Sequence, residues 1–253
     1  MVQQLYIVTG HSRGLGAAIA ARLLKPGHVV IGLSRRTNEA LAMSATAIGS
    51  TLDQWSVDLA EPLPVAQRLR ETLCSFAPER FERAVLINNA GAINAPTALR
   101  DAELGALSAT LRIDLEATLL LCAAFLDATR HWQADRRVLN ISSGLGRRAM
   151  ASSAAYCAAK AGMDHLTRCL ALEEAALPHG ARVLSLAPGV IDTDMQVQLR
   201  GADAAAFPDR ERFIALQREG QLSSAEDAAA RVLACLERAD FGQQPVGDVR
   251  EMA

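Results

Sequence analysis

The sequence has almost no net charge, no long apolar run and no C-x-x-C pair of cysteines. Each of these absences excludes a class of protein. Acidic and basic residues nearly cancel to a formal net charge of −2, so we expect no broad basic face for nucleic acid or an anionic membrane. No uncharged stretch reaches the roughly 18 residues of a membrane-spanning helix. The five cysteines include no C-x-x-C pair, and the five histidines lack metal-ligand spacing. We therefore expect reduced cysteines, no metal site, and surface or turn positions for the histidines.

A secretion signal is also missing from the start of the sequence. Residues 1–9 run directly into a strand-like segment, without the charged beginning and apolar centre of a signal peptide. We expect a cytoplasmic protein.

The residues that are present have the pattern of one α/β domain. Of the 253 residues 50% are apolar, enough for one substantial core, so we assign residues 1–253 to a single domain. Short β-rich runs alternate with longer stretches of helical period, which predicts a Rossmann-like, doubly wound parallel sheet with helices on both faces. The predicted strands cover residues 5–9, 29–33, 55–58, 84–88, 137–142 and 182–185. The predicted helices cover residues 15–24, 38–47, 63–76, 101–131, 153–176 and 225–238.

Residues 192–222 are the least patterned part of the chain. Ligands of open α/β sheets bind beyond the carboxyl ends of the strands, and this segment follows the strand at 182–185. We interpret it as a substrate lid. The alternative is a surface loop without ligand contact.

Three glycines after the first predicted strand form a candidate phosphate cradle. The segment 9–16, TGHSRGLG, joins that strand to a helix. Glycine lets the backbone turn tightly and approach a pyrophosphate, whose charge is attracted by the free N–H groups of a helix start. The spacing G-x-x-x-G-x-G differs from the common dinucleotide fingerprint, so a purely structural turn is the alternative.

The end of the second predicted strand indicates which dinucleotide is bound. A carboxylate there would bind the ribose 2′-hydroxyl, whereas an arginine accommodates a 2′-phosphate. The segment 33–36, LSRR, has no carboxylate. Arg35, helped by Ser34 and by Arg13, can donate charge-assisted hydrogen bonds to the phosphate. The sequence therefore predicts NADP(H) over NAD(H), with merely solvated arginines as the alternative.

Tyr156 and Lys160 are the candidates for the chemistry. They are four residues apart in a predicted helix, so they lie on one helix face. Lys160 is one of only two lysines, with Lys25, in a chain that uses arginine almost everywhere else, which indicates a need for a compact ammonium at this position. This ammonium and an oxidised nicotinamide would both favour the phenolate and make Tyr156 a general acid and base. Ser143, or its rival Ser142, ends the strand at 137–142 and can bind the substrate oxygen; a simple turn former is the alternative.

Together these segments resemble the short-chain dehydrogenase/reductase family in order and spacing. The resemblance also includes the segments 88–91, NNAG, and 188–193, PGVIDT, and it spans nearly the whole chain. It implies a seven-stranded parallel sheet with the last strand near residues 245–249, and a homodimer or homotetramer. It also implies an NADP-dependent oxidoreductase that interconverts a C=O and a CH–OH group of a small molecule.

The resemblance assigns roles to individual residues. Ser143, thirteen residues before Tyr156, matches the catalytic serine and is preferred to Ser142. Tyr156 matches the proton donor, and Lys160 matches the residue that binds the nicotinamide ribose and lowers the pKa of the tyrosine. The cofactor-binding residues implied by position are Gly10, Ser12, Arg13, Gly14, Leu15, Gly16, Ser34, Arg35, Asp58, Leu59, Asn89, Ala90, Gly91, Tyr156, Lys160, Pro188, Gly189, Ile191 and Thr193.

One position departs from the family pattern. The family usually has an asparagine in the helix after the 88–91 segment, where it holds a water linked to the lysine, and Asp114 is the match here. An aspartate can accept the same hydrogen bond, but its charge would offset that of Lys160 and leave Tyr156 less acidic. We therefore place Asp114 with the catalytic residues.

Four strings resemble the sepiapterin reductase and benzil reductase branch of the family. They cover residues 140–144, 155–162, 188–195 and 247–251. That branch reduces a ketone beside a second carbonyl, so we expect a vicinal dicarbonyl or a pterin-side-chain ketone as substrate. A 3-oxoacyl thioester reductase has the same motifs and is the alternative enzyme. An NADP(H)-binding sensor with poor catalysis is the alternative of another class, favoured by Asp114 alone.

Overall fold

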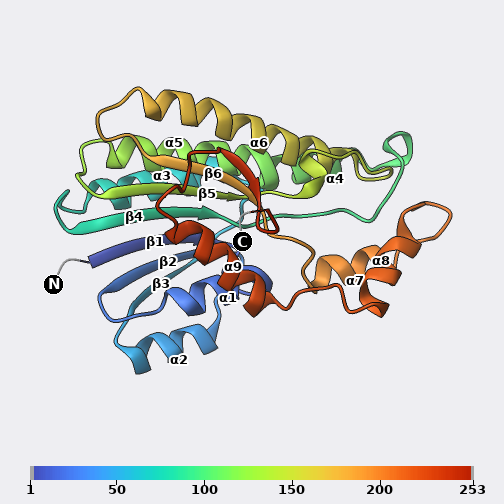
Figure 1. Ribbon diagram of the computed structural model, residues 1–253, viewed down its shortest axis with the longest axis horizontal. Coiled ribbons are helices and arrows are strands. Elements are labelled where there is room, and N and C mark those ends of the chain that lie inside the picture. The colour runs from blue at the N-terminus through green and yellow to red at the C-terminus, as the bar shows by residue number, and fades with distance from the viewer. Residues whose placement is uncertain (1–2, 252–253) are drawn as a thin grey trace.

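A parallel sheet runs through the middle of the molecule, with helices on both of its faces (Figure 1). The structure is a computed structural model that describes residues 3–251. Within these residues the strands form one seven-stranded sheet in the order β3-β2-β1-β4-β5-β6-β7, with parallel neighbours throughout. The strands are β1 Gln3–Thr9, β2 His28–Ser34, β3 Thr51–Ser56, β4 Phe81–Asn88, β5 Asp135–Ile141, β6 Arg182–Ala187 and β7 Val246–Asp248. The predicted fold class is confirmed.

The side chains of β1 alternate between two cores. Leu5 and Ile7 belong to the core beneath the helices on one face, whereas Tyr6 and Val8 belong to the core on the other. Figure 1 shows both layers. The first layer contains α3 Pro62–Cys74, α5 Ala117–Thr129 and α6 Ala154–Ala175, with α4 Leu104–Leu111 beyond them, and the second contains α1 Gly14–Leu23, α2 Glu39–Ile48 and α9 Ala225–Glu237.

The strand order reverses between β1 and β4, and the loops that follow these two strands meet at that point. The Thr9 hydroxyl accepts hydrogen bonds from the backbone N–H groups of Asn89 and Ala90, at 2.9 and 2.8 Å. The Asn89 side chain donates in return to the carbonyl oxygen of Thr9, at 2.9 Å. A reversal of strand order opens a crevice at the carboxyl ends of the strands, the usual ligand site of such sheets.

Three predicted elements differ in the structure. The helix predicted at 101–131 is divided into a 3₁₀ turn Leu99–Asp101, α4, a π-helical turn Arg112–Glu116, and α5. Strand β3 lies earlier than the predicted 55–58, because it is an edge strand whose exposed residues hide the apolar pattern. The segment 192–222 contains two short helices, α7 Asp194–Arg200 and α8 Arg210–Arg218.

Helices α7 and α8 stand at one end of the molecule, apart from the two main layers (Figure 1). They have a small core of their own, formed by Leu199, Phe207 and Phe213. Met150, in the loop before α6, completes this core. The segment therefore packs against the loop that leads into Tyr156.

Residues 3–251 contain neither a candidate membrane-spanning helix nor a cluster of metal ligands. No helix there is both long and apolar enough to cross a membrane. No group of three His, Cys, Asp or Glu side chains gathers there in a way that could hold a metal ion.

Candidate active site

The residues predicted to carry the chemistry meet at the carboxyl edge of the sheet. Ser143 follows β5, Tyr156 and Lys160 lie on α6, and Asp114 lies in the π-helical turn before α5. All four come from the elements that follow β4 and β5, the neighbouring strands at the middle of the sheet. Parallel strands bring such residues together because their carboxyl ends share one edge.

Tyr156 and Lys160 are both buried in this site. Tyr156 is 7% exposed and Lys160 is 3% exposed. The lysine Nζ lies 5.6 Å from the centre of the tyrosine ring. It donates a hydrogen bond to the carbonyl oxygen of Ile141, at 3.0 Å, which holds the ammonium against the end of β5.

The structure separates the two candidate serines. Ser143 lies beside Tyr156, where its side chain lowers the pKa of the phenol. Its hydroxyl also accepts a hydrogen bond from the N–H of Leu145, at 3.2 Å. Ser142 points the other way, because its buried hydroxyl donates to Oδ1 of Asp164 at 2.6 Å. Only Ser143 is therefore placed to share a substrate oxygen with Tyr156.

The pKa of Tyr156 is raised in the protein itself. Burial raises it most, the charge of Asp114 raises it further, and the hydrogen bond with Ser143 lowers it. This direction is opposite to the lowering expected at a working site. Burial also lowers the pKa of Lys160. A lowered pKa of Tyr156 therefore needs a positive charge beyond those of this chain, such as that of an oxidised nicotinamide.

Asp114 is fully buried at the π-helical turn. Its Oδ1 accepts a hydrogen bond from the N–H of Ala92 at 2.7 Å, whereas Oδ2 is buried without a hydrogen-bond partner. Burial raises the pKa of Asp114 to about 6, and the charge of Lys160 and the bond from Ala92 oppose this rise. Gly91 lies between the two charges, since a Cβ added there would be 3.6 Å from the lysine Nζ and 3.7 Å from Oδ1. Isolated π turns often occur at functional sites.

The glycine turn has the backbone that a phosphate cradle needs. Gly10 and Gly14 have φ angles of +71° and +55°, the left-handed region that favours glycine. A Cβ on Gly16 would overlap the Gly10 carbonyl and lie 2.5 Å from Nδ2 of Asn89. A Cβ on Gly14 would meet only the methyl group of Thr193, at 3.8 Å. The turn is therefore closely packed on the side of Asn89 and open on the side of Gly14, where a dinucleotide pyrophosphate would have room.

The side chains beside this turn have different surroundings. Leu15 is buried in the core, and Ser12 is half-buried. Arg13 is exposed and forms an ion pair with Asp194 of α7. Arg13 is therefore paired with the predicted lid rather than free for a phosphate.

The end of β2 presents two exposed arginines, Arg35 and Arg36. Ser34 is only 8% exposed, and its hydroxyl donates to the carbonyl oxygen of Arg36 at 2.6 Å. This hydroxyl shapes the turn that carries the arginines. At the end of β3, Asp58 is exposed and accepts a hydrogen bond from the N–H of Ala60, whereas Leu59 is buried.

The loop after β6 closes the other side of the crevice. Gly189 has a φ of +83°, and Ile191 pairs with Ser223 in an isolated β-bridge. The hydroxyl of Thr193 donates to the carbonyl oxygen of Ile191, at 3.5 Å. The methyl group of Thr193 faces Gly14, so the segment that begins at Pro188 runs beside the glycine turn.

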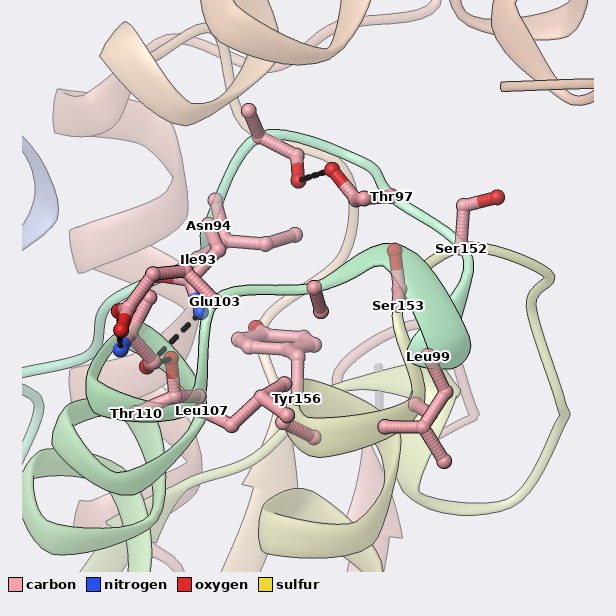
Figure 2. A pocket seen from close by; sticks show the side chains of 15 residues that line it. Ile93, Asn94, Thr97, Leu99, Glu103, Leu107, Thr110, Ser152, Ser153 and Tyr156 are labelled. Carbon is pink, nitrogen blue, oxygen red and sulfur yellow. Dashed lines mark hydrogen bonds between the residues drawn. The ribbon is translucent and has the colours of Figure 1, made fainter. Parts of the chain in front are cut away.

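A cavity of about 280 Å³ opens beside Tyr156. Figure 2 shows the tyrosine ring between the loop after β4 and the start of α6. The wall is mostly apolar, with the carboxylate of Glu103 held by the N–H groups of Gly105 and Ala106 at the start of α4. The lining residues are Ile93, Asn94, Ala95, Thr97, Leu99, Ala102, Glu103, Ala106, Leu107, Thr110, Ser152, Ser153, Ala154, Ala155 and Tyr156.

The sequence did not indicate this wall. Residues 192–222, the predicted substrate lid, do not line this cavity, whose lining residues come from the loop after β4, α4 and the start of α6. Loop residues 93–97 have no periodicity that could have placed them. His11 occupies a turn, as expected, but nothing in the sequence indicated that its ring is fully buried.

Comparisons with known proteins agree with this geometry. A family model described as short chain dehydrogenase matches residues 4–204. A benzil reductase ((S)-benzoin forming) of Bacillus cereus is 37% identical over 240 residues, covering 95% of this chain and 96% of the relative. A sepiapterin reductase of Rattus norvegicus is 33% identical over 247 residues, covering 93% and 92%. The crystal structure of a short chain dehydrogenase from Burkholderia cenocepacia in complex with NADP is 28% identical, with a TM-score of 0.76 and coverage of 97% and 96%.

Proposed function

Because this chain belongs to the short-chain dehydrogenase/reductase family of oxidoreductases, we propose that it uses NADPH to reduce a ketone that lies beside a second carbonyl. Tyr156 is the proton donor in this proposal. The observation that carries it is the meeting of Ser143 and Lys160 at Tyr156, with Ser142 turned away to Asp164.

The glycine turn and Arg35 would hold the cofactor. Gly10, Gly14 and Gly16 leave backbone N–H groups at the start of α1 for the pyrophosphate. Arg35, exposed at the end of β2 where no carboxylate stands, would bind the 2′-phosphate. NADP in the related Burkholderia cenocepacia structure supports this choice of cofactor. Lys160 and the segment Pro188–Thr193 would contact the nicotinamide end.

NADPH held at this site would supply the hydride for the carbonyl carbon. The Ser143 hydroxyl donates a hydrogen bond to the carbonyl oxygen as negative charge develops there. Tyr156 transfers its proton to the same oxygen, and its raised pKa keeps it protonated at neutral pH, as a reduction requires. The Lys160 ammonium, held by Ile141, stabilises the resulting phenolate.

Asp114 takes the place of the family asparagine behind Lys160. Its buried Oδ2 is a free acceptor, and its charge attracts the ammonium. The same charge makes Tyr156 harder to ionise. We therefore expect an enzyme better suited to reduction than to alcohol oxidation at neutral pH.

The substrate class is proposed from the cavity and the relatives. A mostly apolar cavity of about 280 Å³ beside Tyr156 offers room for a ring next to the reacting carbonyl. The relatives are named for benzil and for sepiapterin. A vicinal dicarbonyl or a pterin-side-chain ketone fits both observations.

The test is NADPH consumption with benzil, other 1,2-diketones, sepiapterin and an acetoacetyl thioester, with NADH as the comparison. We expect turnover of a diketone or of sepiapterin with NADPH, and its loss in Tyr156→Phe, which keeps the ring and removes only the acidic hydroxyl. Cofactor binding should persist in that variant. Preferential turnover of the thioester would replace the proposed substrate class, and tight NADPH binding without turnover of any carbonyl would indicate a sensor.

The cofactor assignment has its own test. Arg35→Asp should lower the affinity for NADPH by at least about tenfold and leave that for NADH nearly unchanged, because it removes the cation and adds a carboxylate. Arg22→Asp is the control, since Arg22 is an exposed arginine in the last turn of α1. An unchanged NADPH to NADH preference in Arg35→Asp would refute the assignment.

A further inference from the structure

His11 is a buried polar residue inside the glycine turn. It is 0% exposed, although it lies two residues before the exposed Arg13. Its Nε2 lies 2.8 Å from Oε1 of Gln54, and its Nδ1 lies 3.2 Å from the hydroxyl of Ser34. Gln54 Oε1 also accepts the backbone N–H of Asn38, so it is the amide oxygen and His11 Nε2 is the donor. Burial lowers the pKa of His11, which favours the neutral ring.

The sheet makes room for this ring at one glycine. A Cβ added to Gly32, in the interior of β2, would lie 2.5 to 2.6 Å from three atoms of the His11 ring. Glycine weakens the interior of a strand, so it stands there where another group needs the space. The backbone of β2 and the ring of His11 therefore fit one another.

The hydrogen bonds of His11 lead to the loop that follows β2. Gln54 both accepts from the N–H of Asn38 at 2.7 Å and donates to its carbonyl oxygen at 3.2 Å. The Asn38 side chain donates to the carbonyl oxygen of Ser12 at 3.0 Å and caps α2 through the N–H of Leu41. Ser34, on the other side of the ring, has one hydroxyl proton, which it can donate either to Nδ1 of His11, the acceptor of this tautomer, or to the carbonyl oxygen of Arg36. Both ends of the segment 34–38 are thus tied to His11 and to the glycine turn.

The arginines of this segment need such support. The side chains of Arg35 and Arg36 are exposed, so packing does not order them. How firmly their backbone is held then decides how much conformational entropy the two arginines lose when they bind an anion. We propose that His11 is a positioning residue for cofactor specificity, which fixes the loop 34–38 so that its arginines meet the 2′-phosphate. This inference rests on the proposed NADP(H) preference and extends it to a residue whose side chain is fully buried.

The test uses 2′,5′-ADP and 5′-ADP, which carry the adenosine end with and without the 2′-phosphate. Calorimetry gives the ratio of their affinities for the wild-type protein and for His11→Ala and Gln54→Leu. The second variant keeps the volume of Gln54 and removes its hydrogen bonds. We expect each variant to lose about tenfold in affinity for 2′,5′-ADP and little for 5′-ADP, as the loss of one buried hydrogen-bond link predicts.

His28→Ala is the matched control. His28 is the first residue of β2 and is half-buried. Its Nδ1 hydrogen-bonds with the carbonyl oxygen of Leu23 at 2.8 Å, but it lies at the opposite end of β2 from the arginines. Its variant should keep the wild-type ratio. If His11→Ala and Gln54→Leu also keep that ratio, or weaken both nucleotides equally, His11 has no role in specificity and the inference is overturned. If the wild-type protein itself binds the two nucleotides equally, the proposed NADP(H) preference fails first.

The fit between Gly32 and His11 gives a second readout. Gly32→Ala should displace the ring and reduce the same affinity ratio. Adding Gly32→Ala to His11→Ala should cause no further reduction, because the ring that it would displace is gone. Additive reductions in the double variant would show that the two positions act separately and would contradict the proposed link.

Discussion

At the scale of single residues, two adjacent serines end one strand and face different partners. Ser143 lies beside Tyr156 and lowers the pKa of its phenol, whereas Ser142 donates to the buried Asp164. Asp164 also accepts from Ser185 at 2.6 Å, so Ser142 helps to join β5, β6 and α6. One step along the chain thus separates the serine proposed for catalysis from a serine that links structural elements.

Alanine at each serine should give opposite results. Ser143→Ala should lower kcat by about 100-fold with unchanged NADPH affinity, because it removes a hydrogen bond made to the developing oxyanion. Ser142→Ala should lower the free energy of unfolding by about 1 kcal/mol and change kcat little. Steady-state kinetics and urea unfolding of both variants distinguish the roles. Equal losses of kcat would contradict the assignment.

Asp114 should set the pH dependence of alcohol oxidation. Oxidation needs the phenolate of Tyr156, and the charge of Asp114 raises the pKa of that phenol. Asp114→Asn removes the charge, so the rising limb of kcat/KM should move to lower pH, by about one unit. Asp127→Asn, which changes a half-buried carboxylate of α5 paired with Arg70 of α3, is the control. A rising limb that stays in place would show that Asp114 and Tyr156 are not coupled.

The sequence sufficed to bring the candidate catalytic residues together because their spacing is local. Tyr156 and Lys160 need only one helical turn to meet, and Ser143 needs only the end of a strand. His11 gave no such signal. Its burial depends on Gly32 and Gln54, which come from other strands, and a single histidine in a glycine turn does not reveal them.

At the scale of elements, periodicity located the helices and strands but missed their interruptions. The stretch 101–131 has one apolar pattern, so it predicted one helix. A π-helical turn adds a residue within it and brings the buried Asp114 to the N–H of Ala92. Helices α7 and α8 have only 7 and 9 residues, too few for a convincing period.

The separate core of α7 and α8 should make this segment unfold independently. Phe207 is fully buried and lies against Phe213, with ring centres 5.5 Å apart. Phe207→Ala removes contacts worth about 3 kcal/mol or more, but only from this small core. We expect faster proteolysis within residues 192–222 and a higher substrate KM, with little change in the Tm of the main domain.

Phe125→Ala is the control for that experiment. Phe125 is equally buried, but it belongs to the main core under α5. Its variant should lower the Tm without selective cleavage of residues 192–222. The same Tm loss in both variants, with an unchanged KM in Phe207→Ala, would show that the segment is not an independent lid.

At the scale of the whole molecule, a cluster of charges joins the amino ends of the central strands. Asp135, at the start of β5, accepts hydrogen bonds from Arg83 of β4 at 3.0 Å, from Arg137 at 2.9 Å and from Arg182 of β6 at 2.7 Å. Burial raises the pKa of Asp135, but the bonds from Arg137 and Arg182 outweigh it and lower the pKa to about 2. The carboxylate therefore stabilises the folded state.

The stabilisation by the Asp135 carboxylate depends on pH. The folded pKa lies below the ordinary value of 3.8, so the stabilisation is complete above that value and is lost as the pH falls towards 2. It amounts to about 2 kcal/mol. Asp135→Asn should reduce the free energy of unfolding by at least that amount at pH 7, and urea unfolding should give a smaller difference near pH 3. A difference independent of pH would contradict the role of the carboxylate.

The exposed leucines of α5 and α6 are expected to join copies of the chain. Leu119 is 45% exposed and Leu172 is 77% exposed, on helices that cover the same face of the sheet (Figure 1). We expect a homodimer or homotetramer by light scattering, and a smaller species in the double variant Leu119→Glu/Leu172→Glu. Met43→Glu, on α2 of the other face, should leave the assembly intact. A monomeric wild-type protein would contradict this prediction.

The Asp135 cluster and the active site lie at opposite ends of the same strands. Strand β5 has 7 residues, so about 20 Å separate its two ends, and substitutions this far apart have nearly additive effects on stability. A destabilising change beside Tyr156 can therefore be offset at the amino ends without altering the walls of the cavity. This division favours the evolution of new substrate specificity. Residues that line the cavity can be replaced, by natural selection or by a protein engineer, while changes made elsewhere keep the fold stable.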